Sequence, residues 1–257
     1  MFKMVFLPYG EPPAPADGGH GDKLRRAVIV SVLSVIGIPY MIYLMIFRRS
    51  TIAPVLAAAK AESIKLDPVF KDMTRLQRVW ISTVGQRYLQ GPLEYQRREG
   101  FCSSATLRNV LKSLNASALP PAKSGASTPT KYVAALDAHG HTTSTIVYGS
   151  DGYDAFLAAI KHANSDQYRV AVNFLRSPLF GFASPMYAPF NFLLGIFGGH
   201  FSVVIGYLEE DDLVAVFDVN HSYGPYLVES KRLFRAVNSF DRMTSKSRAV
   251  IVSRVVS

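Results

Sequence analysis

Four residues of this 257-residue chain have the types and spacing for nucleophilic acyl chemistry. Cys102, the only cysteine, stands at the start of a segment with helical periodicity, where amides and helix dipole favour a thiolate. His200 enters a predicted hairpin and Asp218 leaves it, so folding the hairpin brings an imidazole beside a carboxylate that fixes its tautomer. Gln96 precedes the cysteine by six positions and offers an amide to an oxyanion.

Each of these residues also has an ordinary structural interpretation. A lone cysteine is most often a small buried apolar residue, and a lone histidine on a strand usually belongs to the core or the surface. A carboxylate at a strand end or a glutamine in a loop is usually solvated. The combination, in the chain order Cys, His, Asp, is what favours a papain-like arrangement with a helix-borne nucleophile and a sheet-borne base.

The elements that must position these residues can be read from apolar periodicity. The segment from Cys102 to Leu114 is predicted as a helix, with Ser103 or Ser104 as its N-cap. One face of this helix carries Leu107, Val110, Leu111 and Leu114. A second helix is predicted from Tyr153 to His162.

Strands are predicted after these helices. The segment YRVAVNFL, Tyr168 to Leu175, reads as a strand, and HFSVVIGYL, a turn at EEDD and LVAVFDV read as a hairpin. Because helices lead and an antiparallel sheet follows, the sequence predicts the α+β class.

Composition limits the functions that remain. The chain is 49% hydrophobic and 18% charged, which suits one globular core. Its net charge of +9 is spread without a continuous basic run, which argues against nucleic acid as a partner. One cysteine excludes an internal disulfide and a cysteine-based zinc site. The histidines His139, His141 and His162 lack metal-ligand spacing, so no metal ligands are predicted.

The N-terminal part predicts a single-pass membrane protein. Residues 1–26 read as a disordered polar tail, and residues 27–47 form an uncharged run flanked by arginine pairs, long enough for a transmembrane anchor. Basic residues are balanced on the two sides, so the side of the catalytic domain stays open. Residues 48–74 read as a juxtamembrane segment and residues 75–257 as the catalytic domain.

Three stretches resemble one known family. The motifs GGHFSVVIGY (Gly198 to Tyr207), DDLVAVFDV and NSFDRMTSKSRAVIVS (Asn238 to Ser253) look like the catalytic domain of phytochelatin synthase. This family consists of glutathione γ-glutamylcysteinyltransferases of papain-like fold. The spacing of His200 and Asp218 fits the family, and EGFCSSATLRNVLKSL lies where its nucleophile region belongs.

The resemblance implies a two-step acyl transfer. Cys102 would attack the Cys–Gly amide of glutathione, release glycine and hold a γ-Glu-Cys thioester. The acceptor would be a second glutathione, which gives phytochelatin for metal detoxification, or water. The resemblance also implies that the γ-Glu-Cys group is gripped by Asn173, Arg176, Gly199 and Arg248. It implies that no cofactor is covalently bound. It also implies that cadmium or zinc is carried as a glutathione thiolate complex, and it leaves a homodimer open.

The chain departs from the family at two places that matter. After Asp218 it reads DVNHSYGPY, without the cations that usually help form the acceptor side, which favours hydrolysis or another acceptor. An aromatic insert from Ser177 to Ile196 has two equally weighted interpretations, a segment at the lipid interface or a lid packed over the site.

Two rival functions remain open from the sequence. One is a C39-like cysteine peptidase, which has the same Gln, Cys, His, Asp order but typically places Asp-Pro where this chain has Asp218-Val219. The other is a non-catalytic membrane protein with this fold. The four intact catalytic positions favour chemistry over the second rival.

Overall fold

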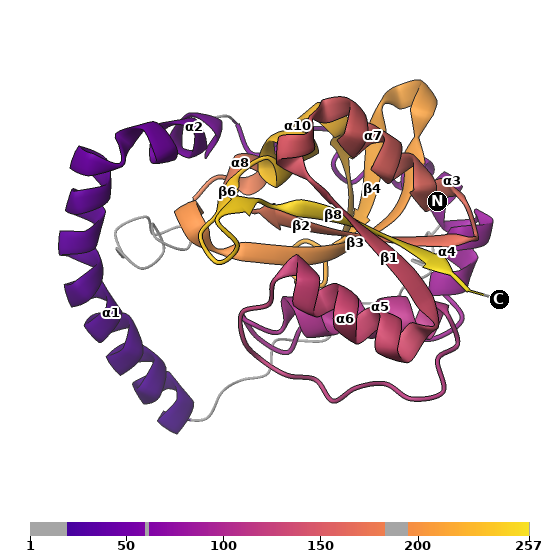
Figure 1. The fold of residues 1–257 in the computed structure, drawn as a ribbon, viewed down its shortest axis with the longest axis horizontal. Helices are drawn as coiled ribbons and strands as arrows, with labels where there is room; N and C mark the ends of the chain where they lie inside the picture. The colour runs from indigo at the N-terminus through magenta and orange to yellow at the C-terminus, as the bar shows by residue number, and fades with distance from the viewer. Residues whose placement is uncertain (1–19, 60–61, 183–194, 257) are drawn as a thin grey trace, which may run out of the picture.

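An antiparallel six-stranded sheet forms the centre of the protein (Figure 1). The computed structural model describes residues 20–59, 62–182 and 195–256. The strand order is β1-β8-β2-β3-β4-β5. The strands are β1 (Thr142–Tyr148), β2 (Tyr168–Leu175), β3 (Gly199–Leu208), β4 (Leu213–Phe217), β5 (Pro225–Glu229) and β8 (Ala249–Val255). A separate ribbon pairs β6 (Phe240–Asp241) with β7 (Lys246–Ser247).

Helices cover both faces of this sheet, which explains why β2, β3, β4 and β8 are apolar and buried on both sides (Figure 1). One face packs against α3 (Met73–Trp80), α4 (Thr83–Tyr88), α5 (Cys102–Ser113) and α6 (Pro129–Gly140). The opposite face packs against α7 (Tyr153–Lys161) and α10 (Ser230–Val237). Short helical turns lie at η1 (Ile64–Leu66), η2 (Gly149–Asp151), η3 (His162–Asn164), η4 (Glu209–Asp211) and α8 (Ser177–Phe180). The α+β class predicted from the sequence is therefore observed.

The helix that carries the cysteine begins as the sequence predicts, but its cap differs. Phe101 is the N-cap and makes no side-chain capping bond. The prediction of a Ser103 or Ser104 cap was wrong, because both residues lie inside the first turn of α5. Ser104 Oγ instead accepts a hydrogen bond of 3.1 Å from the backbone N–H of Lys123, which ties the following loop to the helix.

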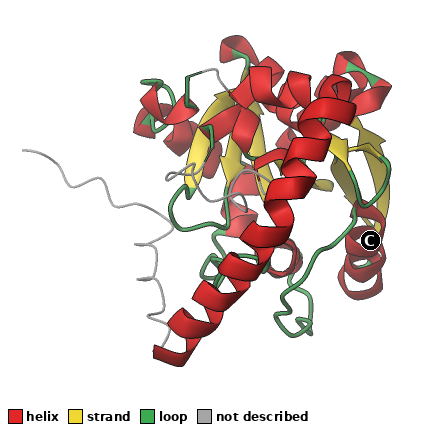
Figure 2. Cartoon of the chain, turned by 90° about the vertical axis from the view of Figure 1, so that its left-hand side faces the viewer, coloured by secondary structure: helices red, strands yellow, loops and turns green. Residues whose placement is uncertain are grey.

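A long helix, α1 (His20–Phe47), precedes the domain and is followed by α2 (Arg49–Ala59). It begins inside the residues predicted as a tail; the rest of that tail, residues 1–19, lies outside the described residues. Figure 2 shows α1 as a long rod beside the sheet and its helices. Among the described residues, no single helix meets the length and hydropathy expected of a membrane span, whereas Val35–Phe47 and Ile52–Ala58, bent by 102°, do so as a pair.

This N-terminal arm contacts the domain through a small apolar cluster. Leu44, Ile52 and Val55 pack against Leu175 and Ile196. Ile196 ends the aromatic insert, so this end of the insert lies beneath the arm. The centre of the insert, residues 183–194, lies outside the described residues, and both interpretations of it remain predictions.

The packed unit also includes residues that precede position 75, the predicted start of the domain. Ile64 and Phe70 are buried in the apolar cluster that contains α7 and α10. The backbone N–H of Leu227 donates 3.1 Å to the carbonyl of Phe70, which attaches this segment to the edge strand β5. Residues 62–72 are therefore part of the folded domain rather than a free stalk.

Candidate active site

Cys102 occupies the first turn of α5, where the sequence placed it. The first backbone N–H groups of a helix have no partners within the helix and carry the positive end of its dipole. Cys102 is 9% exposed, and its sulfur accepts a hydrogen bond from the backbone N–H of Phe201 on β3. The contacts between α5 and β3 thus hold the thiol against the strand that bears His200.

His200 and Asp218 meet at one end of the β3–β4 hairpin. His200 Nε2 lies 2.7 Å from Asp218 Oδ1, and both side chains are buried. The same carboxylate oxygen accepts a hydrogen bond of 2.8 Å from the backbone N–H of Asn220. His200 also hydrogen-bonds the thiol of Cys102. With Nε2 held by Asp218, the ring is oriented so that its other nitrogen serves the thiol.

The electrostatics of this trio favour a thiolate–imidazolium pair. Burial acts to raise the pKa of Cys102, but the hydrogen bond and charge of His200 outweigh it, and the Phe201 amide and Arg176 add to the effect, so the pKa falls below its ordinary value. Burial acts to lower the pKa of His200, but the charge of Asp218 and the hydrogen bonds to Asp218 and Cys102 raise it. The two pKa shifts, in opposite directions, are those expected of a nucleophile and an acid in contact.

We expect a bell-shaped pH profile for kcat/KM. The rate should fall on the acid side as Cys102 is protonated, at a pH below the ordinary thiol pKa, because that pKa is lowered. It should fall on the alkaline side as His200 loses its proton, at a pH above the ordinary imidazole pKa, because that pKa is raised. Rates measured from pH 5 to 10 would test this, and Asp218→Asn should move the alkaline limb to lower pH. A single rising limb near the ordinary thiol pKa would contradict the ion pair.

Gln96 is buried beside the carboxylate of the trio. Its backbone N–H donates 2.7 Å to the carbonyl of Val219, the residue after Asp218. The side-chain oxygen Oε1 of Gln96 is buried and finds no hydrogen-bond partner among the described residues. An oxyanion would need the amide N–H groups of Gln96 rather than this acceptor oxygen, and the role of Gln96 at an oxyanion remains a prediction.

Two of the residues implied to grip the substrate, Asn173 and Arg248, are buried next to His200 and lie against Gly199, which is itself exposed at the start of β3. An added Cβ at Gly199 would lie 2.4 Å from Arg248 Nη1 and 3.4 Å from Asn173 Nδ2. Arg248 is 1% exposed, donates 2.8 Å to the Phe197 carbonyl through Nη2, and has no carboxylate partner within the part of the chain that the structure describes. Asn173 Oδ1 is likewise buried and unpartnered there.

Gly199 should not tolerate a side chain. Gly199→Ala would push a methyl group against the guanidinium of Arg248, which Ser239 and Phe197 hold in place. We expect a loss of about 1–3 kcal/mol in the free energy of unfolding, the usual range for overpacking, and a larger fractional loss of kcat/KM. Urea unfolding and initial rates would measure both. Gly91→Ala, where a Cβ would meet no atom, is the matched control. A fully active, fully stable Gly199→Ala would contradict the close approach.

Arg176 lies near Cys102 but has an internal partner that the sequence did not reveal. Its Nη1 and Nη2 pair with the two carboxylate oxygens of Glu99 at 3.0 and 3.1 Å. Asn220 Nδ2 donates 3.4 Å to the same carboxylate. Glu99 therefore joins the loop before Cys102, the end of β2 and the loop after Asp218. No sequence signal distinguishes Glu99 from a solvated loop residue, because its partners lie 77 and 121 positions away.

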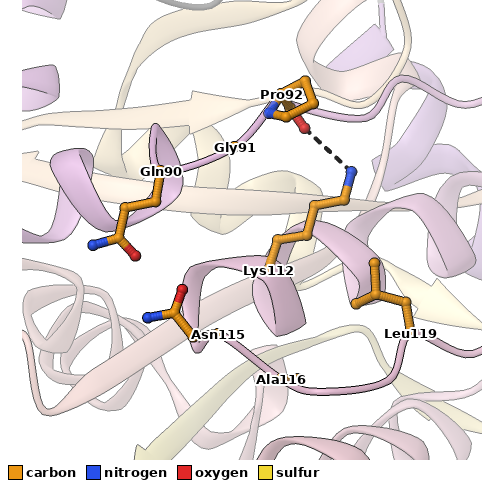
Figure 3. Close-up of a pocket in the computed structure, with 7 residues that line it drawn as sticks. All are labelled: Gln90, Gly91, Pro92, Lys112, Asn115, Ala116 and Leu119. Atoms are coloured by element: carbon orange, nitrogen blue, oxygen red, sulfur yellow. Dashed lines mark hydrogen bonds between the residues drawn. The ribbon is translucent and has the colours of Figure 1, made fainter.

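A separate hollow of about 400 Å³ opens at the other end of α5 (Figure 3). Lys112 and Asn115 line one side and Gln90 and Pro92 the other, with Lys112 Nζ donating 3.2 Å to the Pro92 carbonyl. The rise of an α-helix places Lys112 about 15 Å from Cys102 along the axis. This hollow is therefore distinct from the cysteine site.

A cysteine at a helix N-terminus, a histidine in contact with it and a carboxylate behind the histidine form the arrangement of cysteine-nucleophile acyl-transfer enzymes. The family model of phytochelatin synthase matches residues 127–250, and this part of the chain belongs to the phytochelatin synthase family. No curated protein sequence matches the chain. The matched segment contains His200 and Asp218, whereas Cys102 and Gln96 precede it. Members of this family are γ-glutamylcysteine transferases that use glutathione as substrate.

Proposed function

We propose that this protein is a membrane-anchored enzyme that cleaves the Cys–Gly bond of glutathione through a γ-Glu-Cys thioester on Cys102. The observation that carries the proposal is the trio Cys102, His200 and Asp218, buried together and electrostatically matched, with two of its members inside the phytochelatin synthase segment. A papain-like fold, with the nucleophile on a helix and the base on a sheet, is part of the same proposal.

The first step forms the thioester. The Cys102 thiolate attacks the carbonyl carbon of the Cys–Gly amide, and the developing oxyanion is met by the backbone N–H of Cys102 and the side-chain amide of Gln96. As the C–N bond breaks, the imidazolium of His200 gives its proton to the amine of the departing glycine. The Asp218 carboxylate, in contact with His200 Nε2, stabilises the charged imidazole before the transfer.

The second step transfers the γ-Glu-Cys group from Cys102 to an acceptor. Neutral His200 takes a proton from the attacking water or from the amine of an acceptor, and the new bond forms at the thioester carbonyl. Cys102 leaves as the thiolate, so the thiolate–imidazolium pair is restored. Transfer to a second glutathione yields a γ-Glu-Cys polymer, and transfer to water yields free γ-Glu-Cys.

The buried cluster behind Gly199 supports recognition of the γ-glutamyl end. Arg248 carries a positive charge without an acidic partner at hydrogen-bond distance among the described residues, and Asn173 offers an unpartnered carbonyl oxygen. A free amino-acid end presents one carboxylate and one ammonium, which matches these two groups. Burial lowers the pKa of Arg248 to about 10, against the attraction of Asp241 and Cys102, so the guanidinium stays charged at neutral pH.

The test is to incubate the purified full chain with glutathione, with and without cadmium, and to identify products by mass spectrometry. Release of glycine with free γ-Glu-Cys or its polymers supports the proposal, and polymers show that glutathione is the acceptor. An increase with cadmium would indicate that the thiolate complex is a substrate. If no glycine is released, the proposal fails and a C39-like peptide substrate becomes the better hypothesis.

Attachment to a lipid bilayer is the second part of the proposal. The uncharged residues 27–47 lie within α1, and several of their apolar side chains face outward: Val35 is 72% exposed, Ile46 64% and Phe47 69%. Such a helix gains stability when its apolar surface is covered by lipid. The full chain should co-float with phosphatidylcholine vesicles and resist alkaline carbonate washing.

The double variant Val35→Asp with Ile36→Asp should weaken this association with vesicles. Val256→Asp, at another exposed apolar residue, is the control and should not weaken it. Failure of the unchanged chain to float would remove this part of the proposal.

A further inference from the structure

Two lysines that the mechanism does not use lie over the loop that follows Asp218. They belong to residues 62–72, a segment outside the part of the chain that matches the family. The segment is fixed by Phe70, whose ring stacks on Tyr226 at 5.3 Å and whose carbonyl accepts a hydrogen bond from Leu227. Lys65 and Lys71 are therefore held in place by the fold rather than carried on a free tail.

Both lysines are directed at Tyr223. Lys71 Nζ donates to the carbonyl of Tyr223 and, at 2.5 Å, to that of Pro225. Lys65 Nζ lies 4.4 Å from the centre of the Tyr223 ring, and that ring stacks on Phe180 at 4.0 Å. An ammonium group has three N–H donors. Lys71 uses two of them for the two carbonyls and retains one, and Lys65 retains the N–H donors that do not face the Tyr223 ring.

The positive charge gathered here has no carboxylate in contact with it. Neither lysine forms a salt bridge within the described residues. Burial lowers the pKa of Lys71 to about 8, against the attraction of Asp218 and with a smaller contribution from Lys65. Two neighbouring cations that repel each other favour the binding of an anion between them.

We infer that Lys65 and Lys71, with Tyr223 between them, form a binding site for the carboxylate of the acceptor glutathione. The inference rests on the proposed function and locates its second substrate. The loop 219–224 links this site directly to Asp218, whose N–H bonds the Gly224 carbonyl at 3.0 Å. The α-amine and α-carboxylate of a γ-glutamyl group share one carbon atom, so in this inference a carboxylate held here leaves the neighbouring amine free to attack the thioester.

This site corrects one expectation. DVNHSYGPY contains no lysine or arginine, and the sequence therefore indicated an acceptor side without a cation. In the structure, the cations reach the same loop from a segment about 150 positions earlier, as the contact between Lys71 and Tyr223 shows. The argument for hydrolysis from the missing cations is accordingly weakened.

The transfer that this site serves is balanced without any added reagent. The acceptor's neutral α-amine attacks the thioester carbonyl of γ-Glu-Cys-Cys102 and forms a peptide bond as the C–S bond breaks. The proton of the attacking amine passes to neutral His200, and Cys102 leaves as the thiolate.

The test separates transfer from cleavage. Glycine release counts every acylation, while the ratio of polymer to free γ-Glu-Cys reports how each thioester is used. Lys65→Met should lower that ratio about fivefold at fixed glutathione, the effect of losing one charged contact at a partly exposed site, and Lys65→Glu should lower it further. Glycine release should change less than twofold. Lys131→Met, an exposed lysine on α6, is the matched control. An unchanged ratio in Lys65→Met would overturn the inference.

A second measurement avoids turnover. In the Cys102→Ala chain, titration with glutathione should reveal two sites, and adding Lys65→Met should remove one of them. Lys71→Met should act in the same direction, but Lys71 also holds the loop, so Lys65 carries the test. A wild-type chain that releases glycine yet forms no polymer and binds one glutathione would refute the inference while the proposed cleavage stands. A chain that releases no glycine but binds two would refute the cleavage alone.

Discussion

Glycine release from glutathione should fall by at least about a thousandfold in Cys102→Ala, because the covalent step has no other nucleophile. Cys102 is the only cysteine of the chain, so no second thiol can replace it. His200 and Asp218 would keep their contact of 2.7 Å, since neither depends on the sulfur for its position in the hairpin. The measurement is glycine and γ-Glu-Cys by mass spectrometry at equal protein concentration.

The same variant should keep its fold. Alanine occupies less space than cysteine, and the loss of one buried sulfur should cost no more than about 1–2 kcal/mol in the free energy of unfolding. Thermal unfolding followed by circular dichroism would check this. Ser103→Ala, one position further along the helix, is the control and should stay active. Full activity in Cys102→Ala would remove the mechanism, and an unfolded variant would shift the test to Cys102→Ser.

The parts of the fold that local pattern decides were predicted from the sequence. The strand Tyr168–Leu175 matches β2, and the helix predicted from Cys102 matches α5 to within one residue at its end. The contact of His200 with Asp218 also follows from local information, because a single hairpin joins them. Short apolar runs, helical periodicity and a turn of acidic residues are each encoded within a few positions.

The parts that depend on distant contacts were not predicted. The pairing of Arg176 with Glu99 and the placement of Lys71 on the Tyr223 loop join residues 77 and 152 positions apart. Single-sequence patterns carry no information on such pairs, because a solvated charge and a paired one look alike. Strands β1 and β5 and helices α6 and α10 were also missed, because the segments that encode them are short or mixed in polarity.

Arg248, which the resemblance implied as a substrate-binding residue, leads to the second large effect. Arg248→Met should lower kcat/KM for glutathione about a hundredfold, the loss expected when a charged group no longer meets a carboxylate. The acid limb of the pH profile should also move to higher pH, because Arg248 and Cys102 attract each other and the thiolate would lose a nearby positive charge. A residue that served only to fill space would not move that limb.

The stability of Arg248→Met, unlike its activity, should not fall. Burial costs the guanidinium enough to lower its pKa to about 10, so methionine of similar length should leave the melting temperature unchanged or raise it. Arg254→Met, an exposed arginine on the same strand, is the matched control and should change neither activity nor the pH profile. If Arg248→Met leaves the kinetics unaltered, Arg248 serves only its contacts with Phe197 and Ser239. A large loss of stability with a normal acid limb would show that these contacts, and not the charge beside Cys102, require an arginine at this position.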